Sequence, residues 1–368
     1  MYDILRSALF RIAPEQAHYA AACAARTAQL VRAGGALEKM FGFEDTRLEQ
    51  ALWGNTFSSP IGLAAGFDKN ASLVPFWPTL GFGFAEVGSV TAYSSRGNPK
   101  PRAFRLIEDE ALINRMGLNN KGVRSISRQL RRTAPRSRIP IGINIASTHG
   151  REITGNSAVE DFRMSFKTIA DQAAYIALNI SCPNTRDGKT FEDPESLEVL
   201  LKAIMEQRKK SAPDVPVLLK MPPPVSDRIV FDSTLRETVR LALEYGIAGF
   251  VATNTATDRE GLTTPPARLR AIGRGGLSGR PLEARATHLV RRLYRLTEGA
   301  LPIIGVGGVF SAEDAYRKLR AGASLVQIYT ALVYRGPGVV RDIKTGLVQL
   351  LENDGFDSIT DVVGIDAA

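Results

Sequence analysis

The chain has 368 residues, of which 44% are hydrophobic and 23% are charged, and its formal net charge is +9. This composition is ordinary for a soluble globular protein and argues against a disordered or fibrous chain. Two isolated cysteines, Cys23 and Cys182, and three scattered histidines provide neither a disulfide framework nor the spacing of a metal site, so no metal is expected.

The basic residues form only short clusters, which is typical of solvated helix faces, so we expect no nucleic-acid partner. No apolar run reaches the roughly 18 residues of a spanning helix. The N-terminus lacks the order of a signal peptide and is expected to be retained.

Residues 1–45 are expected to form a helical extension. Apolar residues recur at helical spacing from Ile4 to Ile12, and an alanine stripe runs from Ala17 to Ala28. Pro14 can occupy the first turn of the second helix. We therefore predict a helical hairpin, which could be a cap packed on the main domain or an amphipathic pair that enters a membrane surface.

Residues 46–368 show a repeating alternation of short apolar runs with longer helical stretches. Eight runs are predicted to be buried strands: Ile61–Ala65, Phe84–Ser89, Ile139–Ile145, Tyr175–Ile180, Val215–Lys220, Gly249–Asn254, Pro302–Gly307 and Ser324–Tyr329. Such strands, alternating with helices, predict an α/β fold that closes into a (β/α)8 TIM barrel. The long connection Thr91–Lys121 predicts an excursion over the barrel top. An open doubly wound sheet is the alternative, but "GLAAGFDKN" lacks its glycine fingerprint.

Polar residues collect where these strands end, which is where barrel enzymes place their active sites. Asparagine amides donate and accept, which suits a planar ligand with alternating carbonyl and N–H groups, and a lysine suits a carboxylate. The segments Gly273–Gly279 and Gly305–Gly308, with Tyr329 and Thr330, predict a phosphate cradle. The site should therefore bind a phosphorylated cofactor and a planar acid.

The loop "LNISCPNTRDG", Leu178–Gly188, contains Cys182. The turn-forming residues after it favour a proton acceptor on a loop, with a buried structural thiol as the alternative.

Several motifs resemble dihydroorotate dehydrogenases of the membrane-associated, quinone-using class 2. They include "LAAGFDKN", "EVGSVT", "GNPKPRAFRL", "INRMGLNNKG", "LNISCPNT", "VATNT", "GGLSGRPL", "LPIIGVGG" and "GASLVQIYTAL". The resemblance covers nearly the whole chain. It implies an FMN-bearing barrel that oxidises dihydroorotate to orotate in pyrimidine synthesis, peripherally bound at the cytoplasmic face of the cell membrane through the N-terminal helices, with a membrane quinone as acceptor.

The resemblance also assigns residues, with Cys182 as the catalytic base. It implies that the substrate is bound by Lys69, Asn114, Arg115, Met116, Gly117, Leu118, Asn179, Asn184, Asn254 and Thr255. It implies that FMN is bound by Ala65, Gly66, Phe67, Asp68, Lys69, Ser89, Asn144, Asn179, Lys220, Thr253, Gly279, Gly308, Tyr329 and Thr330. His18, Arg105 and Tyr329 match the family's quinone tunnel.

Three segments depart from the class 2 pattern. Cys182 stands where class 2 enzymes usually have serine and class 1 enzymes have cysteine. "GINIASTHG" lacks the usual Gly-Lys-Asn, and "KMPPPVSD" replaces the usual Lys-x-Ala-Pro-Asp. The alternative function is therefore an FMN oxidoreductase of the same fold that acts on another dihydropyrimidine or uses a soluble acceptor.

Overall fold

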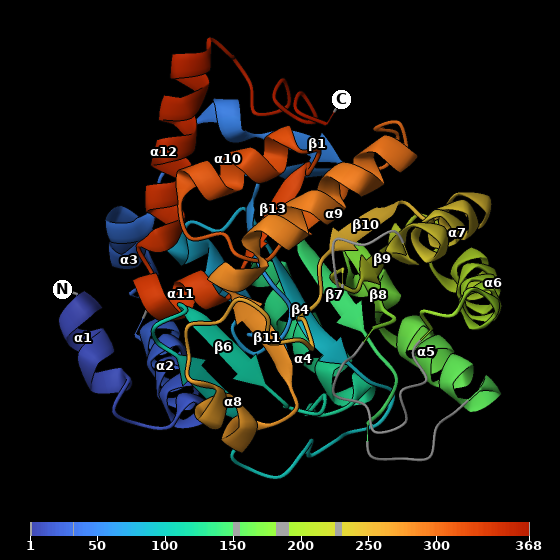
Figure 1. Ribbon diagram of the computed structural model, residues 1–368, viewed down its shortest axis with the longest axis horizontal. Helices are drawn as coiled ribbons and strands as arrows, with labels where there is room; N and C mark the ends of the chain where they lie inside the picture. Colours follow the sequence, from blue (N-terminus) through green and yellow to red (C-terminus); the bar gives the residue numbers. More distant parts are fainter. Residues whose placement is uncertain (1, 32, 150–154, 182–190, 225–229, 368) are drawn as a thin grey trace.

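Eight parallel strands close into a barrel in the computed structural model (Figure 1), which describes all residues except 1, 32, 150–154, 182–190, 225–229 and 368. The strands follow one another around the barrel in chain order: β3 (Ile61–Leu63), β4 (Phe84–Val90), β7 (Ile141–Ile145), β8 (Tyr175–Asn179), β9 (Val217–Met221), β10 (Gly249–Ala252), β12 (Ile303–Val306) and β13 (Leu325–Ile328). Each lies within or overlaps one of the eight predicted runs. The TIM-barrel prediction is therefore confirmed.

Helices surround the barrel and cover the outward faces of its strands (Figure 1). They are α4 (Val123–Thr133), α5 (Asn156–Ile169), α6 (Pro194–Ser211), α7 (Val230–Glu244), α9 (Glu283–Leu296), α10 (Ala312–Arg320), α11 (Thr330–Arg335) and α12 (Val339–Asp354). Aliphatic residues from the helices and strands form one continuous buried core. No helix among the described residues is both long and apolar enough to cross a membrane.

A hairpin of β1 (Gln50–Leu52) and β2 (Asn55–Phe57) closes the amino end of the barrel. Phe57 is fully buried against Phe84 and other inward-facing residues. The Trp53 indole donates to the Ala248 carbonyl at 2.9 Å. Because this end is filled by side chains, only the carboxyl end can open to ligands.

The predicted excursion over the barrel top is present and contains β5 (Ala103–Leu106) and β6 (Ala111–Asn114). These strands join β11 (Gly276–Gly279) in an antiparallel sheet, with Gly279 opposite Ala111. The end of the Gly273–Gly279 segment is thus a strand rather than the expected loop at a helix start. Glycine is required there, since a Cβ on Gly279 would lie 2.4 Å from the Glu110 carbonyl oxygen.

The N-terminal extension is helical as predicted, but it has three helices: α1 (Tyr2–Leu9), α2 (Pro14–Leu30) and α3 (Gly34–Phe41). Figure 1 shows α1 and α2 beside α11 at one side of the barrel. The Tyr2 hydroxyl donates to the Val333 carbonyl at 2.6 Å. Glu15 forms an ion pair of 3.0 Å with Arg102 of the excursion. The extension is therefore attached to the barrel at specific polar contacts.

Candidate active site

The inside of the barrel changes from apolar to polar along the strands. Residues two apart on a strand point to the same side, so inward-facing Phe84 is followed by Glu86, Leu218 by Lys220, and Leu325 by Gln327. The apolar layer packs on the amino-end hairpin. The polar layer lies toward the carboxyl end, where the sequence predicts the site.

A chain of hydrogen bonds joins four of the predicted site residues across the barrel mouth. The Ser89 hydroxyl donates to the side-chain oxygen of Asn144. The Asn179 amide donates to Ser89 Oγ at 3.1 Å, and the Asn254 amide donates to Asn179 Oδ1 at 3.0 Å and to the Ser181 carbonyl. The structure therefore brings together residues that lie far apart in sequence, on β4, β7, β8 and after β10.

Lys220 lies beneath this chain and is almost completely buried. Its Nζ is 3.7 Å from Glu86 Oε1, and the same oxygen accepts a hydrogen bond of 2.9 Å from the Asn144 amide. A buried cation is costly unless it is paired, so the pair with Glu86 accounts for the position of Lys220 inside the barrel.

The predicted substrate residues lie between the excursion and the strand ends. Lys69 Nζ donates to Asn119 Oδ1 at 2.7 Å, and the Asn114 amide donates to the Gly276 carbonyl at 3.3 Å. The backbone N–H of Thr255 donates to Asn254 Oδ1 at 2.9 Å. Lys69 therefore contacts the excursion, and Asn254 links Thr255 to the chain of hydrogen bonds at the mouth.

The segment Arg115–Leu118 continues from β6, with Gly117 and Leu118 in the left-handed backbone region. The Arg115 guanidinium lies 4.7 Å from the Phe104 ring centre and donates to the Ile272 carbonyl. The Met116 carbonyl accepts from the backbone N–H of Asn98 at 3.1 Å. The Arg115 side chain is thus held by the excursion sheet and the end of α8 (Pro266–Ile272).

Two residues of the predicted phosphate cradle, Gly279 and Thr330, lie next to each other. Thr330 begins α11, and its hydroxyl is 3.0 Å from Ser278 Oγ, next to Gly279. Gly308 has φ +75°, and a Cβ there would lie 2.3 Å from the Glu283 Cα. Glycine at 308 therefore lets the loop after β12 pack directly on the start of α9.

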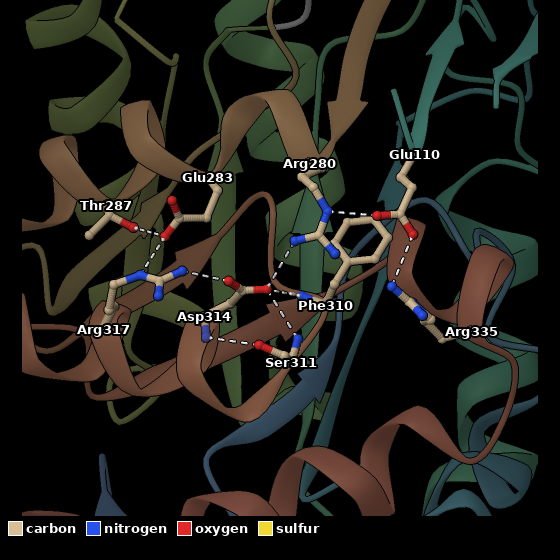
Figure 2. A network of polar contacts seen from close by, with 9 residues as sticks. All are labelled: Glu110, Arg280, Glu283, Thr287, Phe310, Ser311, Asp314, Arg317 and Arg335. Atoms are coloured by element: carbon tan, nitrogen blue, oxygen red, sulfur yellow. Dashed lines mark hydrogen bonds and ion pairs between the residues drawn. The ribbon is translucent and has the colours of Figure 1, made fainter. Parts of the chain in front are cut away.

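A network of charged side chains braces this cradle (Figure 2). Arg280 pairs with Glu110 at 2.7 Å and with Asp314 at 3.6 Å, and its guanidinium stacks 4.5 Å from the centre of the Phe310 ring. Asp314 also accepts from the backbone N–H groups of Phe310 and Ser311, at 2.9 and 3.1 Å. Arg280 therefore ties the end of β11 to the turn before β6 and to the loop after β12.

Predicted cofactor residues follow both β3 and β10. Ala65 and Gly66 lie just after β3, and the Gly66 N–H donates to the Gly88 carbonyl at 2.7 Å. Thr253 follows β10, and its hydroxyl donates to the Asn254 carbonyl at 2.7 Å.

Asp68 has a structural task that the sequence reasoning did not foresee. Its carboxylate accepts from the backbone N–H groups of Ser72 and Leu73 at 2.8 and 2.7 Å, and from the Trp77 indole at 3.4 Å. The side chain is fully buried, and burial raises its pKa. Because both carboxylate oxygens are occupied, a cofactor contact of Asp68 would have to use its backbone.

His18 brings the N-terminal extension to the mouth of the barrel. Its ring packs edge-on against Phe67 at 4.9 Å, and Phe67 packs against Tyr329 at 5.2 Å. Burial and the nearby positive charge of Lys69 lower the pKa of His18, so the imidazole is neutral near pH 7. Burial raises the pKa of Tyr329 to about 12, so its hydroxyl remains protonated.

Arg105 is held by the loop between α1 and α2. Its Nη1 donates to the Ile12 carbonyl at 2.8 Å, and its guanidinium lies 4.6 Å from the Phe10 ring centre. Burial lowers its pKa. Its buried Nε has no acceptor among the described residues.

Cys182 and Asn184 lie outside the described residues.

Sequence reasoning missed Glu86, Tyr175 and Gln327, which form the polar layer with Lys220. Glu86, which stands inside the otherwise apolar strand β4, could have indicated this layer from the sequence, because a buried charge requires polar partners. No local pattern identified Arg280.

The chain is similar to known proteins over nearly its whole length. Residues 47–351 match the dihydroorotate dehydrogenase family model. A protein named dihydroorotate dehydrogenase (quinone) from Halobacterium salinarum is 44% identical over 367 residues, covering 100% of both chains, and one of the same name from Deinococcus deserti is 43% identical, covering 99% of both. A crystal structure of DHODH from Eimeria tenella in complex with ferulenol superposes with a TM-score of 0.83 and 32% identity, covering 96% of this chain and 95% of that one. The chain belongs to the dihydroorotate dehydrogenase family.

Proposed function

We propose that this protein oxidises (S)-dihydroorotate to orotate with a quinone as electron acceptor, and that it uses FMN in doing so. The observation that carries the proposal is the polar cluster at the barrel mouth, in which Ser89 and the amides of Asn144, Asn179 and Asn254 are joined by hydrogen bonds beside buried Lys220. The two relatives named quinone-dependent match the N-terminal extension as well as the barrel, which supports the quinone as acceptor. The reaction belongs to pyrimidine biosynthesis.

The chemistry of the donor set fits FMN. The pyrimidine edge of a flavin presents alternating carbonyl and nitrogen groups, which match the amides of Asn144 and Asn179 and the cation of Lys220. The cradle at Gly279, Gly308 and Thr330 lies at the opposite side of the barrel mouth from β7 and β8, which suits a phosphate. Bound FMN would accept a hydride from the substrate and pass electrons to the quinone.

The chain's own residues bind the acid and move a proton. Lys69 supplies a cation for the substrate carboxylate, and the amides of Asn114 and Asn254 are suited to the ring. Cys182 follows Ser181, whose carbonyl accepts from the Asn254 amide. A cysteine thiol, whose unperturbed pKa is about 8.5, is more readily ionised than the hydroxyl of serine, and we propose that Cys182 takes the C5 proton.

The N-terminal helices are suited to deliver the quinone from a membrane surface. The extension contains many of the exposed large hydrophobic residues, including Ile4, Leu30 and Val31, which are 81%, 83% and 68% exposed. On the barrel side it places His18 against Phe67 and Phe10 against Arg105. The Nε of Arg105, which has no acceptor within the part of the chain that the structure describes, is a donor suited to a quinone carbonyl. We therefore propose that the protein binds a membrane surface peripherally, which in a bacterium would be the cytoplasmic face of the cell membrane.

Anaerobic stopped-flow absorbance tests the proposal directly. The purified protein is mixed with dihydroorotate and then with a ubiquinone analogue, while absorbance is followed at flavin wavelengths. Bleaching that the quinone reverses establishes both half-reactions. Bleaching that the quinone does not reverse would favour the soluble-acceptor alternative, and absence of bleaching would show that the altered segments after Asn144 and Lys220 select another dihydropyrimidine.

A further inference from the structure

Glu86 is a carboxylate buried inside the barrel directly below the proposed flavin site. It is fully buried, and its neighbours Tyr175 and Gln327 are buried to the same degree. Its Oε1 accepts from Asn144 and faces Lys220, while its Oε2 accepts from the Tyr175 hydroxyl at 3.0 Å and from the Gln327 amide at 2.8 Å.

The groups around this carboxylate are hydrogen-bond donors. Burial and the charge of Glu86 raise the pKa of Tyr175 well above its ordinary value, so its hydroxyl keeps its proton and donates. Tyr175 in turn accepts from Gln327 at 3.2 Å. Both oxygens of Glu86 therefore face hydrogen-bond donors, which is the arrangement suited to a carboxylate.

The barrel is built to accommodate this network. Gly142 on β7 faces Tyr175, and a Cβ there would lie 2.1 Å from Tyr175 Cζ. Glu86, Asn144, Tyr175, Lys220 and Gln327 come from five strands, β4, β7, β8, β9 and β13. A site made by so many strands has little freedom to rearrange, so each side chain is held in one position.

We propose that Glu86 is a positioning residue that fixes Lys220 and Asn144 at the flavin edge and sets the reduction potential of the cofactor. The proposal rests on the FMN assignment above. The positive charge of Lys220 would stabilise the negative charge that the ring gains on reduction. The carboxylate of Glu86 would offset part of the positive charge of Lys220. Removing the charge of Glu86 leaves Lys220 uncompensated and favours the reduced ring, whereas removing a donor to Glu86 strengthens its negative field and favours the oxidised ring.

The test is the midpoint potential of the flavin, measured by anaerobic dye-equilibration titration of each holoenzyme. We expect Glu86→Gln to shift the ratio of reduced to oxidised flavin at least tenfold toward reduced, which is a rise of about 30 mV for a two-electron couple. Tyr175→Phe should shift it in the opposite direction. Lys344→Gln is the control for the loss of a buried charge elsewhere in the protein. Lys344 is buried, as Lys220 is, but it donates to the Gly81 carbonyl outside the barrel interior.

The outcomes separate this inference from the FMN assignment. Parent protein that carries no flavin would refute the assignment itself. Flavin-loaded Glu86→Gln with an unchanged potential and a lower melting temperature would show that Glu86 only stabilises the barrel. If Glu86→Gln yields no folded protein, Tyr175→Phe decides alone, since an unchanged or raised potential in that variant contradicts the proposal.

Discussion

Replacing Arg280 with alanine should weaken FMN binding without changing the flavin's chemistry. Arg280 pairs with Glu110 across partly exposed surface, which contributes about 0.5–1 kcal/mol, and stacks on Phe310, which contributes a similar amount, about 0.5–1 kcal/mol. Asp314 keeps its backbone donors and Arg317 in the variant. The loops that flank Gly279 and Gly308 therefore lose about 1–2 kcal/mol of the interaction energy that holds them in place.

Binding would then have to order these loops, so the dissociation constant of FMN should rise about 5- to 30-fold. Flavin fluorescence, which increases on release, measures it by titration of apoprotein. Arg317→Ala is the control, because Arg317 is half-exposed, pairs with Asp314 at 2.6 Å and with Glu283 at 3.3 Å, and has no ion pair with Glu110 (Figure 2). Equal FMN affinities for the two variants would refute the bracing role.

Three further predictions concern the base and the extension. Cys182→Ser should retain measurable turnover with a raised pH optimum and Cys182→Ala should lose most of it; equal pH–rate profiles for Ala and parent would exclude the thiol as base. Deleting residues 1–40 should abolish quinone turnover while dihydroorotate still bleaches the flavin, and unchanged quinone kinetics would remove the assignment of His18 and Arg105. The His18 imidazole should titrate below its ordinary pKa of 6.5 by NMR. Because its folded-state pKa is lowered, its stabilising contribution is present above pH 6.5 and is lost as the pH falls, and a midpoint above 6.5 would contradict the burial argument.

The barrel could be predicted from the sequence because its signal is local and repeated. Each buried parallel strand is a continuous apolar run, and eight such runs alternate with helices. The strand ends could be located for the same reason, so the convergence of Asn144, Asn179 and Lys220 at the barrel mouth could be predicted from their positions at strand ends. These residues lie close together because the carboxyl ends of all eight parallel strands meet at one end of the barrel, so no individual contact had to be predicted.

The excursion sheet and the bracing network could not be predicted in this way. Gly276–Gly279 reads as a loop because glycine disfavours strands, yet it pairs with β6 since only glycine permits the close approach to Glu110. Arg280 and Glu110 are 170 residues apart and carry no periodic signal. Such contacts depend on tertiary structure rather than on local sequence preference.

The short helix α11 links the cofactor end of the site to the N-terminal extension. Its first residue, Thr330, lies in the proposed phosphate cradle, while near its end the carbonyls of Val333 and Tyr334 accept from Tyr2 and Arg6 of α1. The Tyr334 ring packs edge-on against Phe10, which in turn lies under Arg105. Because α11 is six residues long, a displacement of α1 would be transmitted to Thr330 over less than two helical turns. The helices that are suited to receive the quinone are therefore mechanically connected to the residues proposed to hold FMN.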